Sequence, residues 1–176
     1  MKSAFRLGLT AAALAVLALV FPIQHRSVLA ASTASIAIGI DHAGPREIEE
    51  TTQKALARDY ATAWQAMTDA LDQNRAGLLS ANFIGTANDK LTATVQEQSK
   101  AGLHQHITDQ GHSVDAVFYS PEGSAIELHD TAHLQIDVMD GSKVVHSENA
   151  TVHYVALLTA AENSWKVRVL EAVPGF

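Results

Sequence analysis

The chain has 176 residues and no cysteine, with 12 Lys and Arg against 19 Asp and Glu and a formal net charge of −7. The absence of cysteine excludes disulfide bonds, thiol catalysis and thiolate metal sites. The acidic balance argues against binding to nucleic acid or anionic lipid, because such a surface repels phosphate groups.

The start of the chain has the three parts of a secretory signal. Lys2 and Arg6 form a short positive region, and residues 7–21 are an apolar stretch of Ala, Leu and Val. We predict cleavage after Ala30 or Ala31, because small residues stand at the positions that signal peptidase recognises. An uncleaved membrane anchor is the alternative, because the uncharged run of 18 residues approaches the roughly 20 that cross a bilayer. Either route delivers the protein outside the cytoplasm, as a periplasmic or extracellular protein.

One domain is expected after the leader. Residues 1–31 are the signal or anchor, residues 32–45 are small and mainly polar and predict a linker, and residues 46–176 remain for the domain. Removing the leader takes away three basic and no acidic residues, which leaves nine against 19 and a net charge of −10. About 130 residues suffice for one hydrophobic core and not for two.

The first half of the domain has a helical period. Pro45 is predicted to open a long helix that carries one apolar stripe and ends near Asn74. Residues 78–83 indicate a short second helix or a turn. Thr86 and Asp89 have the spacing of a capping box, which predicts the start of a third helix.

From His104 onward the apolar period changes to two. The expected strands are residues 112–119, 124–139, 143–159 and 164–173, separated by short turns. Neighbouring strands joined by short loops pair antiparallel, so we expect a meander. Helices first and strands second predict an α+β fold, with the helices packed on one face of a strongly curved antiparallel sheet.

The hairpin at Asp140 and Gly141 determines which side chains share a face. A three-residue loop with Gly141 at positive φ is predicted, because it aligns the apolar pattern of the two strands, whereas a one-residue slip would move that set into water. The predicted core face carries Leu128, Ala132, Leu134, Ile136 and Val138 beside Val144, Ala150, Val152, Tyr154 and Leu158.

Three segments resemble the NTF2-like, or cystatin-like, superfamily and its SnoaL-like and ketosteroid-isomerase-like branches. They are residues 60–67 (Tyr-Ala-Thr-Ala-Trp-Gln-Ala-Met), residues 78–83 (Leu-Leu-Ser-Ala-Asn-Phe) and residues 165–169 (Trp-Lys-Val-Arg-Val). The resemblance covers roughly residues 46–173 and implies a conical pocket between the helices and the bent sheet. Tyr60 matches the first-helix Tyr of the isomerase branch, but the catalytic Asp positions of that branch find no match.

Three polar residues interrupt the predicted core face, namely Asp130, His146 and Glu148. A carboxylate and an imidazole facing an apolar pocket would act as general base and acid, so these three are the catalytic candidates if the protein is an enzyme. The alternative is that the strands project past the helices and leave these side chains at a wet rim. The expected ligand contacts are Tyr60, Trp64, Asp130, His146, Glu148 and Tyr154.

Several histidines share the opposite face of the sheet. His129, His133 and His153 come close enough in the predicted pairing to raise the question of a Zn or Cu site. No Asp or Glu is placed to complete the ligand set. We therefore predict no metal and no other cofactor.

Three functions remain open. The first is a non-catalytic exported module that binds a small apolar ligand or a protein partner. The second is a cofactor-free SnoaL-like isomerase, cyclase or hydrolase. The third is a VirB8-like component of an envelope assembly. The expected partners are a small apolar ligand, a second copy bound through the sheet or another envelope protein, with no nucleic acid and with membrane contact only through the N-terminal segment.

Overall fold

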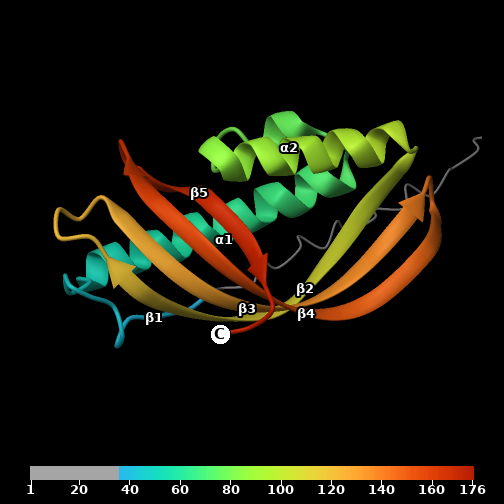
Figure 1. Cartoon of the computed structure of the whole chain (residues 1–176). Coiled ribbons are helices and arrows are strands. Elements are labelled where there is room, and N and C mark those ends of the chain that lie inside the picture. Colours follow the sequence, from blue (N-terminus) through green and yellow to red (C-terminus); the bar gives the residue numbers. More distant parts are fainter. Residues whose placement is uncertain (1–35) are drawn as a thin grey trace, which may run out of the picture. The chain divides into compact units, whose positions relative to one another are not determined.

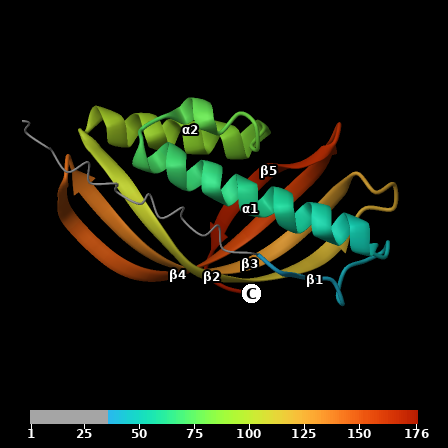
Figure 2. The same ribbon diagram turned by 180° about the vertical axis from the view of Figure 1, so that it is seen from behind.

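Two helices lie on one face of a five-stranded sheet in the computed structural model, which describes residues 36–176 (Figure 1). In chain order the elements are β1 (Ile38–Gly39), α1 (Glu50–Asp72), the 3₁₀ turn η1 (Ala76–Leu78), α2 (Gly85–Lys100), β2 (Leu103–Tyr119), β3 (Ala125–Asp140), β4 (Lys143–Ala161) and β5 (Ser164–Val173). Figure 2 shows from behind that the sheet curves toward the helices. The predicted leader lies outside the described residues. No helix within residues 36–176 is long and apolar enough to cross a membrane.

The strands lie in the order β1-β2-β3-β4-β5, and β2 to β5 form the predicted antiparallel meander. β1 pairs parallel with β2, Ile38 opposite Val114, so the sheet is mixed and not purely antiparallel. Ile36 and Ile38 are buried. Alternate isoleucines have the period of a strand, so residues 36–39 are part of the folded unit and differ from the predicted linker.

The first helix begins later than predicted, and the second helix is capped differently. α1 begins at Glu50 and not at Pro45, since the carbonyl of Gly44 accepts a hydrogen bond from the amide of Tyr119 and holds this segment beside β2. α2 does begin near Thr86, but the capping box does not form. Thr86 Oγ1 instead donates to the carbonyl of Arg168 at 3.1 Å.

The β3–β4 turn has two residues, Gly141 and Ser142, because Asp140 pairs with Lys143. The predicted three-residue loop is therefore wrong, although Gly141 has the expected positive φ of 58°. Val145 follows as an extra residue in β4, where the register shifts. This bulge restores the side-chain alternation that the longer loop was expected to supply.

Beyond the bulge the predicted faces are confirmed. Leu134 lies opposite Ala150, and Asp130 lies opposite Tyr154. Val144 precedes the bulge, so it lies opposite Met139 and is 48 % exposed instead of facing the core.

β2 begins nine residues before the predicted strand start at residue 112 and carries two bulges of its own, of which the first lies at the site. The register shifts between Asp109 and Gly111, which makes Gln110 the extra residue. Gly111 has a φ of 135°, a conformation that favours glycine. Because of this bulge, Asp109 and His112 both point to the concave face, where a regular strand would separate them.

Candidate functional site

A cavity of about 270 Å³ lies between the helices and the concave face of the sheet. Its lining comes from α1 (Trp64, Met67 and Leu71), α2 (Leu91 and Thr94), β2 (Gln105 and Ile107), β3 (Leu134 and Ile136), β4 (Tyr154) and β5 (Leu170 and Ala172). The volume is close to the lower end, about 300 Å³, of typical small-molecule sites. The wall is mainly apolar, with a few hydroxyl and amide groups.

A buried polar cluster lies next to this cavity. Asp130 is completely buried, and its Oδ2 accepts a hydrogen bond from the Tyr60 hydroxyl at 2.8 Å. His112 Nδ1 lies 2.9 Å from Asp130 Oδ1 and 3.0 Å from Oδ2, so this ring nitrogen donates to the carboxylate. His112 Nε2 lies 3.3 Å from Asp109 Oδ2, an ion-pair contact without the alignment of a hydrogen bond. Two carboxylates thus flank one imidazole.

Trp64 separates the polar cluster from the cavity. Its ring packs against His112 at 4.6 Å between centroids and against Tyr154 at 5.5 Å. Tyr60 meets the same indole edge-on at 6.5 Å. Trp64 and Tyr154 line the cavity, whereas Tyr60 and Asp130 lie behind it. A ligand in the cavity would therefore contact the aromatic rings first.

The cluster shifts the ionisation of its neighbours. Burial alone would lower the pKa of His112, but the hydrogen bond and charge of Asp130, with the charge of Asp109, outweigh it and raise this pKa above its usual value. Burial raises the pKa of Tyr154, and the charge of Asp130 raises it further. The pKa of Tyr60 lies well above its usual value, mainly because the side chain is buried and secondly because of the charge of Asp130.

The raised pKa of His112 predicts a pH-dependent stability. A group whose pKa is higher in the folded state contributes stability that is fully present below its unfolded pKa, about 6.5, and is lost as pH rises through the folded pKa. We expect His112→Gln to lower the unfolding free energy more at about pH 6 than at about pH 9. Urea unfolding at both pH values measures this, with His133→Gln on the convex face as the control. Equal losses at both pH values would contradict it.

The six ligand residues expected from the sequence fall into two groups. Asp130 and Tyr154 adjoin each other, as do Tyr60 and Trp64 on the facing helix. His146 and Glu148 lie apart from them on the exposed β3–β4 hairpin, 3.7 Å from each other and more than half exposed. β5 pairs with β4 only from residue 153 onward, so the hairpin extends past it into solvent.

Sequence reasoning missed Asp109 and His112. The expected strand began at His112, which left Asp109 in a loop. The alternation along a regular strand would also have placed the two residues on opposite faces. The only local signal was Gly111, because an isolated glycine inside a strand pattern often marks a bulge.

The histidines on the convex face have structural partners. Phe176 stacks on His129 with ring centroids 4.2 Å apart. His133 and His153 each lie within hydrogen-bond distance of a threonine on the neighbouring strand, at 3.1 and 3.0 Å. Within residues 36–176, no three His, Cys, Asp or Glu side chains are placed to hold a metal ion.

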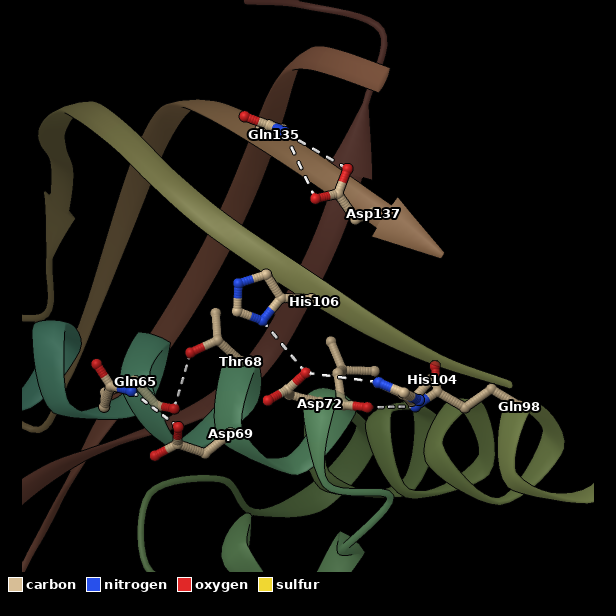
Figure 3. A network of polar contacts seen from close by, with 10 residues as sticks. Gln65, Thr68, Asp69, Asp72, Gln98, His104, His106, Gln135 and Asp137 are labelled. Carbon is tan, nitrogen blue, oxygen red and sulfur yellow. Dashed lines mark hydrogen bonds and ion pairs between the residues drawn. The ribbon is translucent and has the colours of Figure 1, made fainter. Parts of the chain in front are cut away.

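A second polar cluster lies at the C-terminal end of α1 (Figure 3). Asp72 Oδ1 lies 3.2 Å from His106 Nδ1 and 3.9 Å from His104 Nε2. Gln98 of α2 donates to the carbonyl of Leu71 at 2.6 Å. These contacts hold the end of α1 against α2 and β2. Leu71 is also a lining residue, so this end of α1 lies beside the cavity.

No family model and no curated protein sequence matches the chain. The fold is similar to the intermembrane space region of the chloroplast protein ARC6, at 17% identity and a TM-score of 0.62, covering 73% of this chain and 98% of that one. A protein from the NTF2-like family of Streptomyces avermitilis aligns at 10% identity and a TM-score of 0.46, covering 70% and 99%. A cystatin-like domain of unknown function from Nostoc punctiforme aligns at 12% and 0.42, covering 73% and 80%. The chain shares the fold of the ARC6 region, and its order of elements, helices first and a meander of strands after them, agrees with the fold expected from the resemblance.

Proposed function

We propose that this chain is an exported, non-catalytic module that binds a small, largely apolar ligand. The supporting observation is the cavity itself. It is walled by apolar and aromatic side chains from both helices and four strands, and it carries only a few hydrogen-bonding groups. A concave apolar site with a few polar groups is the usual form of a small-molecule site. Trp64 would form one wall and Tyr154 the adjoining one.

The proposal predicts saturable binding of 4-tert-butylphenol, a compact neutral probe. NMR titration should shift the amide signals of cavity residues in the native protein. Ala172→Trp should abolish these shifts, because Ala172 lines the cavity but is itself exposed, so an added indole would fill the space at little cost to stability. Thr151→Trp places the same ring on exposed β4 outside the cavity and should leave binding intact. Shifts that do not saturate, or equal binding by Ala172→Trp, would refute the proposal.

A cofactor-free enzyme of the SnoaL-like kind is the second candidate. The buried contact between Asp130, His112 and Tyr60 favours it, because a carboxylate beside an imidazole is a common acid–base pair. Catalysis would require the bound molecule to reach His112 or Asp130 past Trp64. Nuclear Overhauser contacts between the bound probe and the His112 ring would favour the enzyme, and their absence would favour the binding module.

Export is the remaining part of the proposal. It is supported by the positive start, apolar stretch and small-residue cleavage site within residues 1–31. The mature protein is expected to begin at Ala31 or Ser32. N-terminal sequencing of protein recovered from the cell envelope tests this, and an intact Met1 in the membrane fraction would support the anchor instead.

A further inference from the structure

The residues that line the cavity are uncharged, and a cluster of charged side chains lies next to it. None of its lining residues, all of which lie within residues 36–176, is Lys, Arg, Asp or Glu. Behind the wall lies the Asp109, His112 and Asp130 cluster, which adjoins the cavity through the contact of Trp64 with His112. A ligand in this space therefore experiences the field of that cluster without an intervening protein counter-charge in the wall.

The field of the cluster is negative. Two carboxylates, Asp109 and Asp130, face a single imidazole, so the sum is negative whether or not His112 carries a proton. Asp130 is completely buried, and the His112 side chain is 1 % exposed, so water screens their charges weakly. The groups that face His112 are Tyr60 from α1, Asp109 from β2, Asp130 from β3 and, across Trp64, Tyr154 from β4.

Two neighbouring groups respond to this field in the same direction. The carboxylates raise the pKa of His112 in spite of its burial, so the site favours a positive charge on that ring. Burial and then Asp130 raise the pKa of Tyr154, so the site disfavours a negative charge on a hydroxyl that belongs to the cavity wall. The contribution of the Asp130 charge therefore has the same sign at His112 and at Tyr154, on both sides of Trp64.

Aromatic rings complete the recognition surface. Trp64 and Tyr154 lie 5.5 Å apart at 76° between planes, so they form a nearly right-angled corner. Both rings line the cavity, so a cation bound there can contact their π systems, and Trp is the most favourable ring for this contact. The rest of the wall offers methyl and methylene groups, with Thr94 and Gln105 as its other polar side chains. A primary ammonium would leave donors unpaired there, whereas a quaternary ammonium has none.

We propose that the ligand of the cavity is a small quaternary ammonium compound with a hydrocarbon body. This inference rests on the proposed ligand-binding function and adds the charge of the ligand. Its hydrocarbon part would contact the apolar wall, and its methylated nitrogen would lie in the corner of Trp64 and Tyr154. The buried carboxylates behind Trp64 supply the preference for positive charge.

The test compares three probes of one shape. (4-Hydroxyphenyl)trimethylammonium is the cation, 4-tert-butylphenol is its neutral isostere, and 4-hydroxybenzenesulfonate is the anion. We expect the native protein to bind the cation about tenfold more tightly than the neutral probe, and to bind the anion more weakly than either. Titration calorimetry at low ionic strength, with NMR for weak complexes, gives the three affinities.

Two variants locate the source of the preference. Asp109→Asn removes one carboxylate of the cluster at a side chain that is 25 % exposed, so the fold tolerates it. It should reduce the preference for the cation several-fold without changing the affinity for the neutral probe. Asp140→Asn makes the same charge change at the exposed hairpin tip. It should change neither the preference for the cation nor the affinity for the neutral probe.

The possible results separate the two proposals. If the neutral probe binds as tightly as the cation, the charge inference is overturned while the binding function stands. If none of the three probes binds, both are overturned. If the cation is preferred equally by the native protein and by Asp109→Asn, the cluster is not the source of the preference, and the inference fails in the form proposed.

Discussion

Replacing Asp130 by Ala is expected to lower the unfolding free energy by about 3–5 kcal/mol, the usual cost of removing one partner from a buried ion pair. The substitution would leave the His112 imidazole facing only Asp109 and the Tyr60 hydroxyl without its acceptor. Both groups are buried, so water cannot replace the lost carboxylate without opening the core. Urea unfolding near pH 7, followed by circular dichroism, measures the loss.

Two further variants show whether the loss of unfolding free energy comes from breaking the Asp130–His112 pair. Asp109→Ala removes a carboxylate that is 25 % exposed and should cost less than about 1 kcal/mol. Combining Asp130→Leu with His112→Phe removes both charges together, and the double variant should be more stable than Asp130→Ala. A loss below about 1 kcal/mol for Asp130→Ala would mean that the contact is not an ion pair of the folded state.

Leu134→Asp should destabilise the protein by several kcal/mol, about 3–5, and Thr151→Asp should change stability by less than about 0.5 kcal/mol. Leu134 is 1 % exposed on the concave face of β3, so the substitution would bring an unpaired charge into the core. Thr151 is exposed on the adjoining strand, where its hydroxyl lies 3.1 Å from His133.

Thermal melts of the two variants test the register of the sheet. The two positions lie on neighbouring strands near the same level, since Leu134 pairs with Ala150. A slip of one residue between β3 and β4 would bring Thr151 to the core face opposite Leu134. Melts in which Thr151→Asp is the more damaging change would therefore show that the pairing is wrong.

Local patterns were sufficient for much of this fold. The apolar stripe that contains Tyr60 and Trp64 has the helical period, and the alternation along β3 and β4 places Asp130 and Tyr154 on one face. These periods depend only on neighbouring residues, so they can be recognised without knowing the tertiary structure. Half of the candidate site followed from them, because its helix and its two central strands are regular over these residues.

Helix and turn boundaries were less accessible from the sequence. Pro45 carries an ordinary helix-start signal, yet it lies beside Tyr119 of a distant strand and α1 begins at Glu50. Thr86 does lie at the start of α2, but its hydroxyl donates to the carbonyl of Arg168 and caps no amide of its own helix. A helix-capping preference of about 1 kcal/mol is outweighed when hydrogen bonds to another element hold the same residues. The short strand β1 was missed for the same reason, since Val114, with which Ile38 pairs, is 76 residues further along the chain.

The amino-acid sequence by itself determined the order of the elements, the faces of the central strands and the signal-like start of the chain, because each depends on spacing within a short segment. Only the tertiary structure decided that His112 joins Asp130, and that His146 and Glu148 do not. The bulge at Gln110 turns Asp109 to the concave face with His112, and the end of β5 leaves the hairpin in solvent. Both depend on how strands distant in sequence pair, and one extra residue in a strand reverses every side chain that follows it.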